Sequence, residues 1–179
     1  EILDEPSDDG KPPAIAVLPF KNLSNDEEQE YFADGITEDI IANLSLWKTF
    51  PVISRNSSFT FKNTAEKSDV ISKALGASYL VEGSVRKAGN KVRITAQLTS
   101  AEDDKQIWSK KWDRSLEDIF EVQDEVSRDV AALISPALKD QEQVKLSSKG
   151  KKNFGAWDEY LQGLNIYNTE DFVGSTAGD

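Results

Sequence analysis

The sequence predicts a mixed α/β domain, with a β-sheet of about five strands, helices packed on one face, and a separate C-terminal amphipathic helix. Three patterns carry this prediction. Residues 14–20 are an apolar run typical of a buried strand. Between residues 26 and 47 apolar side chains recur every three or four positions, as on one face of a helix. Two stretches at 78–87 and 91–100 flank Ala-Gly-Asn and predict a β-hairpin.

The first strand ends at Pro19 and the turn-forming stretch that follows it. The next helix has Asn25 or Asp26 as a plausible N-cap, with glutamates in its first turn. Gly35 weakens this helix, which indicates that another backbone approaches it. The apolar face consists of Phe32, Ile36, Ile40, Leu44 and Trp47.

The middle of the chain predicts a second strand at 50–55, a polar loop, and a short helix at 69–75. Ser68 is available as the cap of that helix and Gly76 as its stop.

The second arm of the hairpin alternates strictly, so that one side of it is apolar and the other polar. The apolar side consists of Val92, Ile94, Ala96 and Leu98. A further strand, 105–114, carries Trp108 and Trp112 on one face, where packing is favoured over stacking on a ligand.

A long helix is expected from Ser115, where Ser115-x-x-Asp118 resembles a capping box. Pro136 is expected to bend or end it. Its apolar stripe consists of Leu116, Ile119, Phe120, Val126, Val130, Leu133 and Ile134.

These elements divide the chain into a flexible acidic linker at 1–13, an α/β domain at 14–140 and a linker at 141–152. A last amphipathic helix at 153–169 and a disordered tail at 170–179 follow. The stripe of the last helix consists of Phe154, Trp157, Leu161, Leu164 and Tyr167. A lone helix must bury such a stripe, either by folding back onto the domain, by pairing with a second copy or against a missing neighbour. A truncated helical repeat is the favoured interpretation, and we expect a protein partner or self-association.

The amino-acid composition argues against several classes of function. The net charge is −11 and the sequence contains no Cys, His or Met. The acidic balance argues against a nucleic-acid surface and against adhesion to anionic lipid. Without Cys and His there is no thiolate nucleophile, no Ser-His-Asp triad and no Cys-based zinc site. No apolar stretch reaches the length of a bilayer span, so we expect no direct membrane contact, while a tether upstream stays open.

Seven acidic residues in the stretch 26–39 raise the question of a metal site or a carboxylate pair. A calcium loop needs ligands at alternating positions around a sharp turn, whereas this stretch is helix-periodic. The favoured interpretation is therefore a solvated helix face. We expect no catalytic residues, cofactor or metal. The rival is an enzyme that uses carboxylates alone: burial of a close Asp/Glu pair would favour it, and full exposure of Asp34, Glu38 and Asp39 would exclude it.

Two other places are candidate binding sites. Arg55, Asn56 and Ser57 follow the predicted strand, where ligands commonly bind in open α/β sheets, although a turn with Ser and Asn bonded to backbone is the simpler interpretation. The polar side of the hairpin is either wet or covered by a helix or partner. It consists of Glu82, Ser84, Arg86, Arg93, Thr95 and Gln97.

Several long stretches together resemble the TolB N-terminal-like domain of bacterial signalling proteins. They are IAVLPFKNLSNDEEQEYFADGITEDIIANLS, VISRNSSFTFK, LGASYLVEGSVRKAGNKVRITAQLTSAEDDKQIWSKKWDR and LEDIFEVQDEV, and they span about residues 14–135. The resemblance implies a mixed sheet with two long helices on one side and no catalytic residues. It also implies a place between a signalling module and tetratricopeptide repeats, whose first helix NFGAWDEYLQGLNIYNTED resembles.

The upstream module in such proteins is a class III adenylate or guanylate cyclase or a winged-helix domain, often followed by one transmembrane helix. We therefore expect a non-enzymatic regulatory or protein-interaction domain of a bacterial signal-transduction protein. The periplasmic side of a membrane-tethered parent is favoured, and the cytoplasm stays open. The alternative is a small-ligand sensor with its pocket near residues 55–58.

Overall fold

The computed structural model describes residues 12–48 and 50–148. The fold described below is that of the compact unit Pro13–Lys139. The elements in chain order are β1 (Ile15–Val17), β2 (Lys21–Asn22), α1 (Glu28–Trp47), α2 (Arg55–Phe59), α3 (Ser68–Leu75), β3 (Tyr79–Ala88), β4 (Lys91–Ser100), β5 (Lys105–Ser115) and α4 (Ile119–Ser148).

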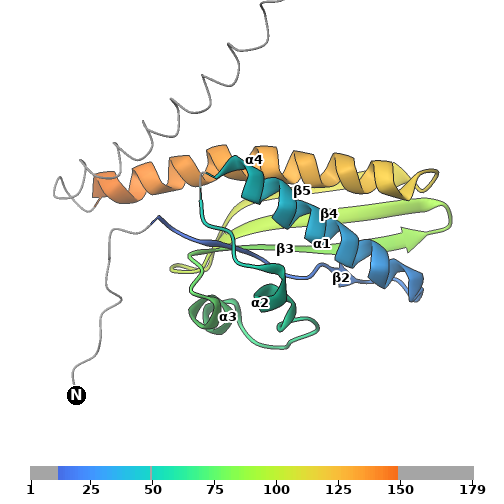
Figure 1. Ribbon diagram of the computed structural model, residues 1–179, viewed down its shortest axis with the longest axis horizontal. Coiled ribbons are helices and arrows are strands. Elements are labelled where there is room, and N and C mark those ends of the chain that lie inside the picture. Colours follow the sequence, from blue (N-terminus) through green and yellow to red (C-terminus); the bar gives the residue numbers. More distant parts are fainter. Residues whose placement is uncertain (1–11, 49, 149–179) are drawn as a thin grey trace, which may run out of the picture. The chain divides into compact units, whose positions relative to one another are not determined.

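The strands form one five-stranded mixed sheet in the order β1-β3-β4-β5, in which β2 also pairs with β3. Strands β1 and β2 run parallel to β3, whereas β3, β4 and β5 form an antiparallel meander. The long helices α1 and α4 cover one face of this sheet (Figure 1). The predicted fold class is therefore confirmed.

The alternation in β4 sets which face is covered. Val92, Ile94, Ala96 and Leu98 are at most 1% exposed, and they lie on the face that α1 and α4 cover. Helix α1 turns Phe32, Ile36, Ile40 and Leu44 inward, as its periodicity predicts. A second, smaller core lies around Leu80, which points to the opposite face of β3 from Val81. It consists of Ala16, Leu18, Ile71, Ala77 and Leu80.

The predicted strand at 50–55 is wrong except for one bridge. Val52 bridges to Ile15, and only the flanking bonds from Ile15 N–H to the Pro51 carbonyl and from Ile53 N–H to the Ile15 carbonyl extend it. The backbone then turns into α2, because the Ser54 hydroxyl accepts a hydrogen bond from the Ser57 N–H at 3.3 Å and caps that helix. The predicted polar loop therefore begins with a helical turn.

The predicted helix ends are partly confirmed. The N-cap position of α1 is Glu27, whose side chain makes no capping bond, while the carboxylate of the predicted Asp26 accepts a hydrogen bond from the Glu28 N–H at 3.0 Å. Gly76 ends α3 with a φ of +66°, a backbone conformation that glycine adopts without strain. Ser68 is not the cap but the first residue of α3.

The start of α4 also differs from the prediction. Ser115 is still in β5, and the Asp118 carboxylate caps α4 by accepting a hydrogen bond from the Glu121 N–H at 3.1 Å. The buried stripe of α4 therefore begins at Val122 and not at Leu116, which lies before the helix, and Ile119 and Phe120 are exposed instead of buried.

Pro136 does not end α4, which continues to Ser148. The helix therefore includes residues 141–148, which the sequence predicted as part of a linker. The expected linker at 1–11, the last amphipathic helix at 153–169 and the tail at 170–179 lie outside the described residues.

Candidate functional site

Gln123 of α4 packs against Gly35 of α1, where the absence of a side chain leaves space for it. A Cβ placed there would lie 2.3 Å from the Gln123 side-chain nitrogen, so only glycine leaves room for that amide. The Gln123 amide donates a buried hydrogen bond to the Phe32 carbonyl at 3.2 Å. The sequence indicated a close approach at Gly35, and the group that approaches is a side chain rather than a backbone.

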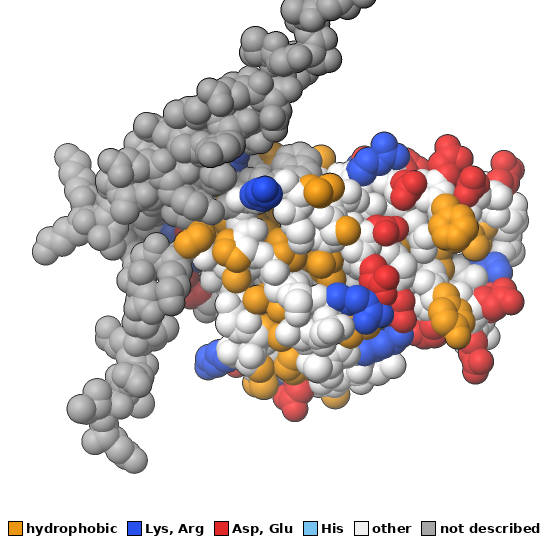
Figure 2. Space-filling model, in the orientation of Figure 1, with side chains coloured by type: hydrophobic (Ala, Val, Ile, Leu, Met, Phe, Trp, Pro, Cys, Tyr) orange, Lys and Arg blue, Asp and Glu red, His pale blue; other side chains and the backbone are white. Residues whose placement is uncertain are grey.

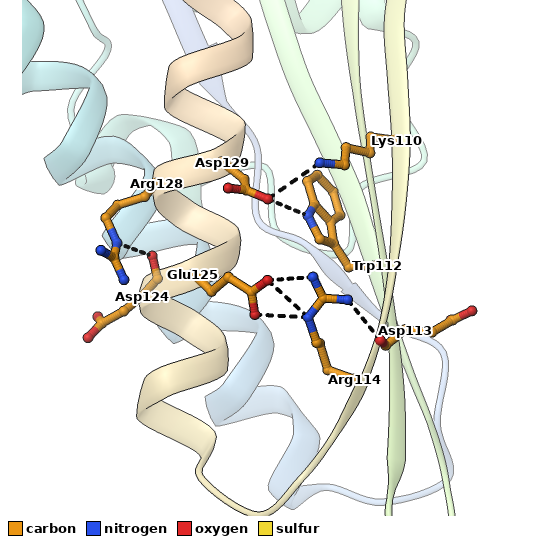
Figure 3. A network of polar contacts seen from close by, with 8 residues as sticks. All are labelled: Lys110, Trp112, Asp113, Arg114, Asp124, Glu125, Arg128 and Asp129. Carbon is orange, nitrogen blue, oxygen red and sulfur yellow. Dashed lines mark hydrogen bonds and ion pairs between the residues drawn. The ribbon is translucent and has the colours of Figure 1, made fainter.

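A polar network fixes α4 to the edge strand β5 (Figure 3). The indole N–H of Trp112 donates to an Asp129 carboxylate oxygen at 2.9 Å, and Lys110 pairs with the same oxygen at 3.4 Å. The hydrogen bond from Trp112 is the main cause of the lowered pKa of Asp129. Trp112 is buried and lies 6.2 Å from Trp108 between ring centroids, so the tryptophans pack as predicted.

A second ion pair in this network joins Arg114 to Glu125. The Arg114 Nε lies 2.8 Å and 3.0 Å from the two carboxylate oxygens of Glu125, and Nη2 contacts the same group. Hydrogen bonding by Arg114 lowers the pKa of Glu125. These contacts serve the packing of α4 on the sheet, and a structural role accounts for them.

The opposite face of the meander is polar. Its side chains form rows across the strands: Arg86, Arg93 and Asp113 in one, Ser84, Thr95 and Lys111 in the next, Glu82, Gln97 and Ser109 in the third. Arg93 binds Asp113 in a bidentate pair at 2.7 Å and 3.0 Å, and Gln97 donates to Glu82 at 3.2 Å. The pair with Arg93 lowers the pKa of Asp113. We call this surface the open sheet face.

Cations outnumber carboxylates on the open sheet face, although the whole chain has a net charge of −11. Register places Lys21, Arg86, Lys91, Arg93 and Lys111 there, against Glu82 and Asp113. Arg86 and Arg93 stand directly opposite each other, an arrangement that destabilises a sheet unless another group compensates it. Asp113 compensates Arg93.

A shallow hollow of about 200 Å³ lies on the same face, lined by Lys21, Glu82, Gly83, Ser84, Thr95 and Gln97. The sequence prediction included six residues of this surface but missed Lys21, Lys91, Ser109, Lys111 and Asp113. Lys21 was missed because β2 has only two residues within a turn-like stretch. Lys111 and Asp113 could have been found from the period of two in β5, since Trp112 between them points inward.

Arg55, Asn56 and Ser57, the predicted ligand site, form most of α2. Arg55 pairs with Glu38 of α1 at 2.5 Å, and its guanidinium lies 4.0 Å from the centre of the Phe59 ring. None of these three residues lines the hollow on the open sheet face. Their ligand role stays a prediction.

The acidic residues of α1 are mostly matched by cations. Lys62 bonds both Asp34 oxygens, at 2.8 Å and 2.7 Å, and lies 3.4 Å from Glu30. Asp39 is half-buried; burial, then the charges of Asp124 and Glu38, raise its pKa. Within residues 12–48 and 50–148 no group of three or more metal-ligating side chains could hold an ion.

The predicted interaction helix, with Phe154, Trp157, Leu161, Leu164 and Tyr167, lies outside the described residues.

Among the helices that the structure describes, none combines the length and the apolar character needed to cross a bilayer.

Comparison with known proteins gives a relative and several fold neighbours. The chain is 47% identical over 146 residues to a Rhizobium meliloti (strain 1021) protein named "Putative adenylate cyclase 3". That match covers 82% of this chain and 25% of the relative, so the chain spans about a quarter of the relative's length.

Solved structures with a similar fold include lipoprotein GNA1162 of Neisseria meningitidis, with 20% identity, a TM-score of 0.49, and coverage of 58% of this chain and 81% of that one. TolB of Acinetobacter baumannii matches with 17% identity, a TM-score of 0.46, and coverage of 72% of this chain and 28% of that one. No functional statement follows from these neighbours.

The model of the TolB amino-terminal domain matches residues 7–107, which takes in β1 to β4 and the first residues of β5. The match covers more than half of the sequence and includes the hairpin that carries the open sheet face. The chain therefore belongs to the TolB amino-terminal domain family.

Proposed function

We propose that this chain is a non-enzymatic regulatory and protein-interaction domain of a bacterial signal-transduction protein whose output is a class III adenylate or guanylate cyclase. The observation that carries the proposal is the 47% identity to a relative named as an adenylate cyclase, of which the chain spans only 25%. The remainder of such a parent has ample length for a separate catalytic module. A transcription regulator is the alternative output.

The structure supports a role in binding rather than in catalysis. Two of the three carboxylates considered for an acid–base pair face cations, Asp34 facing Lys62 and Glu38 facing Arg55, whereas Asp39 is half-buried near Asp124. The open sheet face is charged, and within the described residues α1 and α4 cover the other face of the sheet (Figure 1), while side chains of the open face from Glu82 to Arg93 are half-buried or exposed. A folded sheet with one such face free is suited to binding a partner.

The proposal extends to the surroundings of the domain. We place it on the periplasmic side of a membrane-tethered parent, with the cytoplasm as the alternative, and take residues 153–169 as the start of a tetratricopeptide repeat. Both extensions rest on the family resemblance alone.

Cyclic nucleotide formation tests the proposal. The isolated chain should form no cyclic AMP or cyclic GMP from ATP or GTP with Mg²⁺ or Mn²⁺. The parent protein lacking residues 14–139 should still form the product, at a rate that differs from that of the intact parent. Product formation by the isolated chain would contradict a non-enzymatic role, and an unchanged rate in the deletion variant would contradict regulation.

A small-ligand sensor is the second candidate, favoured by the hollow of about 200 Å³ on the open sheet face. A ligand that binds only the folded chain, at 100 times its dissociation constant, adds about 2.7 kcal/mol to the unfolding free energy. Thermal denaturation across a metabolite library detects such a gain, and a library that shifts no midpoint removes this candidate.

A further inference from the structure

The two long helices begin at the same end of the sheet. Gln123 of α4 bonds the Phe32 carbonyl of α1, and Ser127, one turn further along α4, bonds Asn43, further along α1, at 2.9 Å. The contacts follow the same order in both helices, so α1 and α4 run in the same direction and both begin at the same end of the sheet (Figure 1). The Leu116 N–H donates to the Asn90 carbonyl, which ties the start of α4 to the β3–β4 turn.

Large apolar side chains are exposed at this end. Tyr31 in the first turn of α1 is 83% exposed and Phe120 in the first turn of α4 is 77% exposed. Leu23, whose N–H bonds Val85 at the same end, is 51% exposed, and Ile119 is 41% exposed. A single exposed apolar residue needs no explanation, but several at one end of a domain mark a surface for interaction. We call these residues the helix-start patch.

The helix-start patch is surrounded by carboxylates. Glu27, Glu28, Glu117 and Glu121 are exposed beside it, and Figure 2 shows apolar patches among acidic side chains over the starts of α1 and α4. Two cations at this end face carboxylates, since Lys87 pairs with Asp26 at 3.0 Å and Arg114 with Glu125. Helix N-termini favour acidic residues in any protein, but they do not favour exposed Tyr and Phe.

We propose that the helix-start patch is the docking site for a basic amphipathic segment of a partner protein. Aliphatic side chains of that segment would cover Tyr31 and Phe120, while its Lys or Arg residues would face Glu28 and Glu121. Charge complementarity selects this occupant, because an acidic or neutral apolar segment would leave the surrounding glutamates without counter-charges. The inference rests on the proposed interaction role and adds to the open sheet face a second surface with a partner chemistry of its own.

Two model peptides test the inference on the full chain of 179 residues. One is built from Leu and Lys with Leu at helical spacing, and the other replaces every Lys by Glu. Fluorescence anisotropy of labelled peptides should show binding of the Leu/Lys peptide at least about tenfold tighter than that of the Leu/Glu peptide. Equal affinity for both peptides, or no binding of either, overturns the proposal.

Variants locate the site. Tyr31→Ser combined with Phe120→Ser should weaken Leu/Lys binding at least about tenfold. Leu46→Ser is the matched control, since Leu46 is 75% exposed near the other end of α1, and it should leave the affinity unchanged. Glu28→Gln combined with Glu121→Gln, which keeps the apolar patch, should weaken binding and reduce its dependence on salt. Equal loss in the Leu46 variant, or no loss in the Tyr31/Phe120 variant, overturns the proposal.

Sedimentation tests whether a second copy of the chain, and not a partner protein, occupies the helix-start patch. If the unmodified chain dimerises and the Tyr31/Phe120 variant does not, the patch serves a second copy and the proposal is overturned. Failure of the peptides to bind leaves the proposed function standing if deletion of residues 14–139 still changes cyclase output. The two proposals therefore fail separately.

Discussion

The two faces of the meander differ along a single strand. On β4, Ile94 is completely buried beneath the helices, whereas its neighbour Thr95 lies half-buried on the open sheet face between Ser84 and Lys111. The covered face is apolar and is tied to α4 by buried and partly buried hydrogen bonds, whereas the open face carries ion pairs that any solvated sheet can form. The covered face accounts for the fold, and the open face is what the fold leaves available to partners.

Substitutions at these neighbouring positions give the largest expected contrast. Ile94→Ala removes a fully buried side chain and should lower the unfolding free energy by about 2–5 kcal/mol. Thr95→Ala, one residue later, should change it by less than about 0.5 kcal/mol. Urea denaturation measures both, and comparable losses at the two positions would show that the open sheet face is part of the packed core.

Gly83→Ala probes the covered face from β3. A Cβ at this position would lie 2.3 Å from the Phe20 ring and 2.5 Å from the Thr95 carbonyl oxygen, which is backbone and cannot rotate away. We expect a loss of about 1–3 kcal/mol in urea denaturation. Ser84→Ala, its neighbour on the open sheet face, is the control and should have almost no effect; stability retained in both variants would contradict the tight packing of Phe20.

Thr37→Val tests one buried hydrogen bond on the covered side. The Thr37 hydroxyl accepts from the Phe20 N–H at 3.0 Å and is fully buried. Valine fills the same volume but leaves that N–H unsatisfied, at a cost of about 1–3 kcal/mol. The same change on the open face, Thr95→Val, should cost nothing measurable by thermal denaturation, and a matching loss there would refute the distinction between the faces.

The ion pair between Arg114 and Glu125 gives the smallest effect. Because Arg114 lowers the pKa of Glu125 in the folded chain, the stabilisation is present above the usual glutamate pKa of about 4.3 and is lost as pH falls through the lowered value. Glu125→Gln should therefore flatten the decrease of unfolding free energy below about pH 5.

Asp39 acts in the opposite direction, because burial raises its pKa and makes its ionised form unfavourable at neutral pH. Asp39 is present in both the unmodified chain and the Glu125→Gln variant, so the difference between their pH profiles of unfolding free energy reports the contribution of Glu125. Arg114→Gln should flatten the acid limb in the same way, and urea titrations that retain the full slope in both variants would show that the pair contributes nothing to stability.

Patterns with many repeats were predicted correctly from the sequence, and features decided by single contacts were not. The alternation in β4 and the stripe of α1 identified the buried residues because each repeats a burial preference several times. The strand at 50–55 failed because the Ser54 cap turns its backbone into α2. The exposure of Ile119 and Phe120 was missed because α4 begins at Ile119, a position set by Asp118 and not by apolar periodicity.

The prediction of the candidate surfaces from the sequence was limited in the same way. The polar side of the hairpin was found from alternation, but its cationic character depends on Lys21 and Lys111, which only the register of β2 and β5 brings beside it. The helix-start patch depends on both long helices beginning at the same end of the sheet. Gln123 of α4 contacts Gly35 and Phe32 of α1 in that arrangement. Sequence spacing within one helix contains no information about such pairings.

The most direct test of the central claim separates folding from output in the parent protein. Lys21→Gln and Lys111→Gln would be introduced together on the open sheet face, after urea denaturation of the isolated chain has shown an unfolding free energy within about 0.5 kcal/mol of the unmodified chain. If this face serves an interaction that regulates the parent, its cyclic nucleotide output should change although the domain stays folded. An output identical to that of the unmodified parent would contradict the claim that this face binds the regulating partner.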